Sequence, residues 1–262
     1  MIASRDADCV PELVVDGHIA TLRLRRPARL NRLSRQDLLE IIRHCESINA
    51  APEVRVVVLT ADTTGQAKPV FSAGYDVSGF DSDAHDPHLF ENTVNAVAQL
   101  RPVAIAGLNG SVYGGATDLI LACDLRIALP DLSWRMPACA LGLHYYPSGL
   151  HRYLNAFGPD RTRQLFLTAQ PVGSEELHKW GVLMELVQSD DWTHRLYTLS
   201  QQVAQLAPLA TQGTKASIDE LARGIADESQ LRRRERCCAN SGDFLEGRQA
   251  MAERRTPVFK GH

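Results

Sequence analysis

Two short glycine-bearing segments constrain this chain more than any other feature of its sequence. The first is FSAGYDV at residues 71–77, and the second is NGSVYGGATD at residues 109–118. Each follows a run rich in β-branched residues, at 54–60 and 103–108 respectively, as is typical of strands. Glycine lets a chain turn sharply where a strand ends. The pattern therefore predicts two strand-turn units, each with backbone N–H groups exposed in its turn.

The first 190 residues alternate strand and helix patterns. Asp16-Gly17 lies between two strand-like runs, which predicts a hairpin, and Ser34 is a typical N-cap before a helical repeat of apolar residues. Helices are also predicted over 87–100 and 116–122, with a strand over 125–129. This order is typical of an α/β fold with a largely parallel sheet covered by helices. The glycine patterns of nucleotide-binding loops are missing from the sequence.

Beyond residue 190 the pattern changes to helices alone. Helical periodicity runs through 191–206, 210–224, 229–238 and 244–253, with almost no strand pattern between them. We therefore divide the chain into an α/β core at 1–190 and a helical segment at 191–262.

Composition excludes several classes of protein. A net charge of −3 leaves no basic excess for binding nucleic acid or an acidic membrane surface. The sequence has no apolar run of the roughly 20 residues that span a bilayer. Residues 1–9 carry acidic side chains where a signal peptide needs apolar ones. The six cysteines lack C-x-x-C spacing, so we expect reduced thiols, a cytoplasmic location and no bound metal.

As an ordered pair, the two glycine segments resemble the oxyanion hole of the enoyl-CoA hydratase/isomerase (crotonase) family. The resemblance implies that the backbone N–H groups of Tyr75 and Gly115 stabilise a thioester enolate. It also implies a spiral of repeated ββα units, and C-terminal helices that join subunits into a homotrimer or a dimer of trimers. Coenzyme A then enters as part of the acyl-CoA substrate, and no separate cofactor is expected. Two ordinary glycine turns are the structural alternative.

The same resemblance implies a binding region for coenzyme A. The segment RPARLN at residues 26–31 is similar to the first CoA-binding strip of the family. The implied substrate-binding residues are Ala28, Arg29 and Leu30 in that strip, Ala73, Asp76 and Val77 beside the first turn, and Phe259 and Lys260 from a neighbouring chain.

The chemistry departs from that of a standard hydratase. Adding water to a double bond needs two carboxyl groups, one as base and one as acid. Asp118 stands where the first is expected in the family, three residues after Gly115. The second belongs to a Pro-Glu step, but here that step is Pro137-Ala138, and Ala138 has no carboxyl group. The sequence therefore disfavours efficient hydration.

A third segment, LGLHYYPSGLH at residues 141–151, narrows the reaction. Together with residues 110–118 it is similar to the methylmalonyl-CoA decarboxylase branch of the family, which has a tyrosine where Tyr145 stands. That branch has histidine in place of Tyr75 and glutamate in place of Asp118. Decarboxylation of a malonyl-type thioester yields an enolate without a base, so the oxyanion hole supplies most of the stabilisation. A phenol there orients the carboxylate or donates a proton.

Three functions follow from these residues. The first is an enolate-stabilising acyl-CoA enzyme that decarboxylates, cleaves a C–C bond or isomerises. The second is a true enoyl-CoA hydratase of fatty-acid or aromatic-acid breakdown, with a substitute acid from elsewhere. The third is a non-catalytic CoA-binding subunit. Asp118 either takes part in catalysis or is merely stabilised at a helix N-terminus, and Tyr145 either acts directly or lines the pocket.

Overall fold

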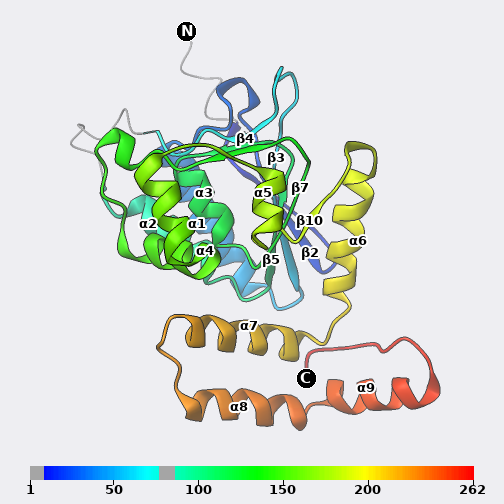
Figure 1. Cartoon of the computed structure of the whole chain (residues 1–262). Helices are drawn as coiled ribbons and strands as arrows, with labels where there is room; N and C mark the ends of the chain where they lie inside the picture. Colours follow the sequence, from blue (N-terminus) through cyan, green and yellow to red (C-terminus); the bar gives the residue numbers. More distant parts are fainter. Residues whose placement is uncertain (1–8, 77–85) are drawn as a thin grey trace.

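The computed structural model describes residues 9–76 and 86–262. Two sheets form the core, with helices packed against them (Figure 1). In spatial order the first sheet contains β1 (Glu12–Asp16), β2 (Ile19–Leu24), β3 (Val56–Ala61), β5 (Val103–Leu108), β7 (Leu125–Ala128) and β10 (Glu185–Leu186). The second contains β4 (Val70–Ser72), β6 (Ser111–Tyr113), β8 (Ser133–Arg135) and β9 (Val172–Gly173).

The helices follow the strands and then continue alone. In chain order they are α1 (Arg35–Ala50), α2 (Leu89–Ala98), α3 (Gly115–Leu121), α4 (Pro147–Thr168), α5 (Ser174–Lys179), α6 (Trp192–Ala204), α7 (Pro208–Ala222), α8 (Glu228–Ala239) and α9 (Gly242–Glu253). Short 3-10 turns lie at η2 (Pro27–Arg29), η4 (Cys139–Leu141) and η5 (Ser189–Asp191).

A repeated ββα unit generates the spiral. The units are β3-β4-α2, β5-β6-α3 and β7-β8-α4, and each gives its first strand to the first sheet and its second strand to the other. The strands of successive units pair in parallel, so that Val56 lies opposite Val103 and Val70 opposite Ser111. The predicted crotonase-like α/β spiral is therefore confirmed.

Local sequence explains where several elements begin and end. The Asp16-Gly17 hairpin forms as predicted, with Gly17 at φ 55°. Ser34 caps α1 and exchanges hydrogen bonds with Asp37 in a capping box. Helix α4 breaks at Gly158, which has a φ of 68° and is followed by Pro159. The predicted helices over 87–100 and 116–122 are observed as α2 and α3, with their ends shifted by one or two residues.

Both faces of the central strand β3 are buried, which accounts for its continuous apolar sequence. On β3, Val57 and Leu59 face the main core, whereas Val56 and Val58 face a second cluster on the opposite side. Leu199 of α6 completes that second cluster. Strands that are covered on both faces lose the alternation of apolar and polar residues.

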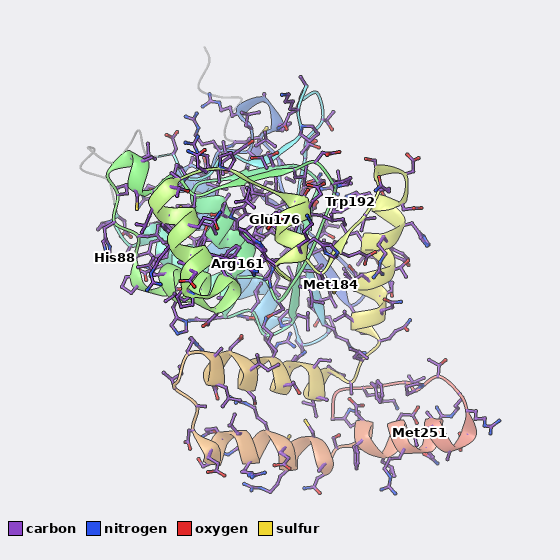
Figure 2. The ribbon with its side chains drawn as sticks, in the orientation of Figure 1. His88, Arg161, Glu176, Met184, Trp192 and Met251 are labelled. Atoms are coloured by element: carbon purple, nitrogen blue, oxygen red, sulfur yellow. The ribbon has the colours of Figure 1, made fainter. Side chains whose placement is uncertain are left out.

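Helices α7, α8 and α9 lie to one side of the core (Figure 1). Helix α6 follows residue 190, yet its side chains pack against the first sheet. The expected division of the chain into two parts at residue 190 therefore stays a prediction. Lys215 ties α7 to the core through Asp124, at 2.7 Å, and through the Pro102 carbonyl, at 2.9 Å. Figure 2 labels Trp192 at the start of α6, next to the first sheet. It also labels Met251 on α9, which lies far from the sheets. Over the described residues, no helix is both long enough and apolar enough to cross a membrane.

Candidate active site

The first glycine turn is fixed by the strip that precedes α1. The amide of Ala73 donates to the Leu30 carbonyl at 2.8 Å, and the amide of Leu33 donates to the Gly74 carbonyl at 2.9 Å. The amide of Asp76 then donates to the Leu33 carbonyl at 2.9 Å. The structure thus brings the predicted CoA strip alongside the turn that carries Tyr75.

The second turn lies directly against the first because β4 and β6 are parallel neighbours. Gly114 has φ 57°, and Gly115 begins α3, where backbone N–H groups have no acceptor within the helix. Gly74 has φ 91°, and a Cβ atom there would lie 2.6 Å from the Tyr113 carbonyl oxygen and 3.2 Å from the Gly115 nitrogen. Only glycine fits this contact, so the backbones of the two turns lie in close contact.

Aromatic side chains line the region beside the turns. The rings of Tyr75 and Phe90 stack with centroids 5.3 Å apart. Phe90 also packs against Gly115, where an added Cβ would lie 2.5 Å from the Phe90 Cζ atom. On the other side, Phe90 meets Tyr146 edge-to-face at 6.1 Å. An apolar wall therefore runs from the first turn to the start of α4.

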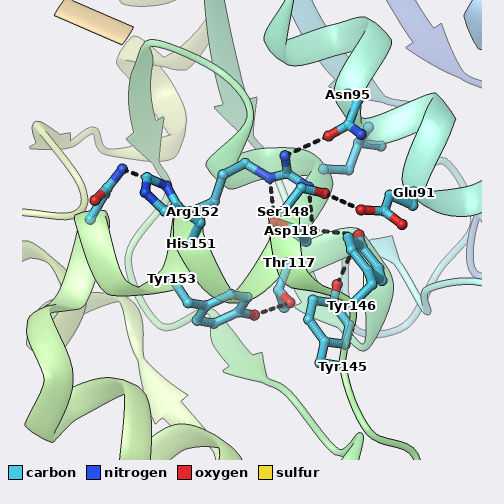
Figure 3. Close-up of polar contacts among 12 residues, drawn as sticks. Glu91, Asn95, Thr117, Asp118, Tyr145, Tyr146, Ser148, His151, Arg152 and Tyr153 are labelled. Carbon is cyan, nitrogen blue, oxygen red and sulfur yellow. Dashed lines mark hydrogen bonds and ion pairs between the residues drawn. The ribbon is translucent and has the colours of Figure 1, made fainter. Parts of the chain in front are cut away.

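Asp118 is fully buried and held by two partners that the sequence analysis did not select. Arg152 donates from Nε to one carboxylate oxygen and from Nη2 to the other, both at 2.8 Å (Figure 3). The Tyr146 hydroxyl also donates to Asp118 Oδ2, and Arg152 Nη1 donates to Asn95 at 2.9 Å. A buried bidentate pair of this kind fixes the geometry of both groups.

Three tyrosines, which we call the phenol cluster, pack together on one side of this ion pair: Tyr145, Tyr146 and Tyr153. The Tyr145 hydroxyl donates to the Tyr146 oxygen at 3.2 Å, and the Tyr153 hydroxyl is hydrogen-bonded to Thr117. Burial raises the pKa of each phenol above its ordinary value, and the Asp118 charge raises each pKa further. The phenols are therefore protonated at neutral pH and act as hydrogen-bond donors.

Signals for Arg152 and Tyr146 were present in the sequence but were weak. Tyr146 adjoins the predicted Tyr145, and Ser148 and Arg152 are one helical turn apart on α4. Ser148 donates to the Glu91 carboxylate at 2.6 Å, so this face of α4 turns toward α2 (Figure 3). An arginine at that spacing has many uses, and only the packing of α3 against α4 selects Asp118 as its partner.

The position expected to carry the second carboxyl is apolar and buried. Ala138 is 5% exposed and immediately precedes η4. Because both oxygens of Asp118 are bound to Arg152, the pair of carboxyl groups that would hold a water is lacking at these two positions. Among the described residues, no group of three His, Cys, Asp or Glu side chains is arranged to hold a metal ion.

Comparison with known proteins identifies the family of this chain. A family model described as "Enoyl-CoA hydratase/isomerase" matches residues 15–262. The chain belongs to this family. It is 26% identical over 259 residues to methylmalonyl-CoA decarboxylase of Escherichia coli K12, covering 95% of this chain and 97% of that protein.

Two solved structures extend the likeness to the fold. The crystal structure of enoyl-CoA hydratase from Bacillus anthracis has a TM-score of 0.84 and 26% identity, over 96% of this chain and 99% of that one. A methylmalonyl-CoA decarboxylase in complex with 2-nitronate-propionyl-CoA has a TM-score of 0.74 and 25% identity, over 97% and 99% of the two chains. Members of the enoyl-CoA hydratase/isomerase family with different reactions thus share this architecture.

The residues that the family resemblance assigns to coenzyme A fall into two places. Ala28 and Arg29 lie in η2, directly before Leu30, beside the first turn. Asp76 donates its amide to the Leu33 carbonyl and has an ion-pair contact of 3.7 Å with Arg32. Val77 lies outside the described residues.

Phe259 and Lys260 lie on the opposite side of the core from the glycine turns, where they contact residues of the same chain. The Phe259 carbonyl accepts from Arg55 at 2.8 Å, and the Lys260 amide donates to Asp243 at 2.7 Å. Their expected contact with the coenzyme A of a neighbouring subunit stays a prediction.

A cavity of about 1190 Å³ lies between the core and α7. Its lining includes Asn95 and Arg152 on one side and Lys215 and Phe259 on another. The described residues of the two glycine turns are not part of that lining. The Asp118–Arg152 pair therefore has the phenol cluster on one side and this cavity on the other.

Proposed function

We propose that this enoyl-CoA hydratase/isomerase family member binds an acyl-CoA thioester and stabilises its enolate with the backbone N–H groups of Tyr75 and Gly115. The contact between the two turns supports this proposal, since Gly74 approaches the Gly115 nitrogen so closely that a Cβ would stand only 3.2 Å away. Donors fixed in advance at the developing negative charge are the largest single contribution in many such reactions.

The reaction we propose is decarboxylation, C–C cleavage or isomerisation rather than efficient hydration. One observation carries this choice: Asp118 is bound on both oxygens by Arg152, and Ala138 supplies no second carboxyl group. A water between two carboxyl groups would lack its holders at these positions. The identity to a methylmalonyl-CoA decarboxylase over nearly the whole chain also supports the choice.

For a malonyl-type thioester the bond changes are simple. The bond between Cα and the carboxylate carbon breaks, CO₂ leaves, and the electron pair moves to the thioester oxygen as an enolate. We assign the protonated hydroxyl of Tyr145, which lies close to Tyr146, as the hydrogen-bond donor to the carboxylate that leaves as CO₂. A proton then adds to Cα and gives the shortened acyl-CoA.

A substrate comparison tests this assignment. The purified protein is incubated with methylmalonyl-CoA and with crotonyl-CoA, while CO₂ release and loss of the conjugated thioester absorbance are followed. We expect CO₂ release and slow or no hydration. Hydration at an ordinary enzymatic rate, on the order of 10 s⁻¹, would refute the choice of reaction. Tight CoA binding without turnover of either thioester would instead support a non-catalytic CoA-binding subunit.

Glu91 gives the hydratase alternative a specific candidate. Its side chain is 22% exposed, on α2 next to Phe90, and it accepts from Ser148 at 2.6 Å. A carboxylate at that place is the substitute acid that hydration of an enoyl-CoA would need. If crotonyl-CoA is hydrated, Glu91→Gln should remove that activity, with Glu176→Gln on the exposed face of α5 as the control.

Assembly and location are further proposals. Apolar side chains are exposed on α7 and α9, including Ile218, Leu221, Leu245 and Met251, and a face of this kind is typical of a subunit interface. They support a homotrimer or a dimer of trimers, which sedimentation velocity would distinguish from a monomer. The six cysteines, which all lie within the described residues, form no disulfide, and this supports a reducing compartment such as the cytoplasm.

A further inference from the structure

One continuous chain of polar contacts crosses the site. Asn95 accepts from Arg152, Arg152 donates twice to Asp118, and Tyr146 donates to Asp118 from the opposite direction. Tyr145 then donates to the oxygen of Tyr146 (Figure 3). This series of contacts joins α2, α3 and the start of α4, elements that are separate in the sequence.

We infer that Asp118 is a positioning residue rather than an acid or base of the reaction. Held by Arg152, it fixes the hydroxyl of Tyr146, which in turn aligns the hydroxyl of Tyr145 for an anionic group on the acyl chain. This inference rests on the proposed function, because it concerns how the same site recognises its acyl group.

Packing keeps Asp118 away from a ligand. Its side chain has no exposed surface, and Arg152 is bound to both of its oxygens. Gly149 closes another side, where an added Cβ would lie 2.8 Å from Asp118 Oδ2 and 2.3 Å from a ring carbon of Tyr145. A carboxylate enclosed in this way can influence a ligand only through the residues that it contacts.

The direction of the hydrogen bonds sets the orientation of the phenols. The Tyr146 hydrogen is committed to Asp118, so its oxygen is left to accept the Tyr145 hydrogen. A phenol oxygen is a weaker acceptor than an anion, because hydrogen bonds to ionised groups are roughly twice as strong as neutral ones. A carboxylate on the acyl chain therefore takes over the Tyr145 hydrogen, while an uncharged acyl group leaves it on Tyr146.

Relative affinity for a charged and an uncharged acyl group measures this alignment without turnover. Isothermal titration calorimetry compares 2-nitronate-propionyl-CoA, whose nitronate is a planar anion, with propionyl-CoA. We expect the wild-type protein to prefer the nitronate by about tenfold or more, as for a hydrogen bond to a charged group. Tyr145→Phe should abolish the preference.

Three further variants decide whether Asp118 acts through Tyr146. Tyr146→Phe and Asp118→Asn should each lower the preference by a similar factor, and the double variant should lower it no further, since the residues act in series. Tyr153→Phe is the matched control: it removes a buried hydroxyl of the same cluster that bonds Thr117 instead, and should keep the wild-type ratio. Circular dichroism confirms that each variant is folded.

The outcomes separate this inference from the proposed function. If Tyr145→Phe abolishes the preference but Tyr146→Phe and Asp118→Asn keep the wild-type ratio, the positioning role is refuted and the proposed function stands. A double variant that loses the product of the two single factors would also refute it, because Asp118 would then act independently of Tyr146. If the wild-type protein binds neither CoA ligand, the proposed function fails and this inference with it.

Discussion

Replacing Arg152 with glutamine tests the buried ion pair most directly. Asp118 is fully buried and Arg152 is 14% exposed, and two hydrogen bonds of 2.8 Å join them. Removing the guanidinium leaves a buried carboxylate with the Tyr146 hydroxyl as its remaining polar contact in the described network. Breaking a buried pair in this way costs about 3–5 kcal/mol of the free energy of unfolding.

The expected loss from Arg152→Gln is a large share of a total stability of about 5–15 kcal/mol.

Urea unfolding, followed by far-ultraviolet circular dichroism at one fixed protein concentration, measures the effect at pH 7. Arg195→Gln is the matched control, since the Arg195–Glu185 pair is partly exposed, and about 0–1 kcal/mol is expected there. Adding Asp118→Asn to Arg152→Gln removes the unpaired charge and should restore part of the loss. The reasoning fails if Arg152→Gln costs no more than the control.

Three further outcomes are expected. The raised pKa values of the phenol cluster keep these phenols protonated in the folded state at a pH where unfolded tyrosine ionises. The free energy of unfolding in urea should therefore be unaffected by these groups below about pH 10 and fall above it by up to about 1.4 kcal/mol per pH unit for each phenol. A flat profile between pH 10 and 11 would contradict this. Gly115→Ala places a methyl 2.5 Å from Phe90 and should weaken acyl-CoA binding in calorimetry and cost about 1–3 kcal/mol, whereas Gly213→Ala, in ordinary contact, should do neither. Burial raises the pKa of the Cys123 thiol to about 12, so a disulfide reagent should label exposed Cys139 in the folded protein and reach Cys123 only on unfolding; rapid native labelling of Cys123 would count against the core described above.

The sequence alone determined the features that depend on near neighbours. The Asp16-Gly17 hairpin, the Ser34 cap and the two glycine turns each follow from residues within a few positions of one another. The lack of a carboxyl group at Ala138 is equally local, because no folding can supply one. These signals predicted an α/β fold with a largely parallel sheet, whereas the spiral of ββα units was expected from the family resemblance.

Only the tertiary structure decided what Asp118 contacts. Its partner Arg152 lies 34 residues along the chain, and the contact exists because α3 and α4 pack side by side. The place of Phe90 against Gly115 depends in the same way on how α2 approaches α3. Helix propensity and periodicity fix which residues share a face of one helix, but the angle and distance between helices set which side chains meet, and those follow from packing of the whole core.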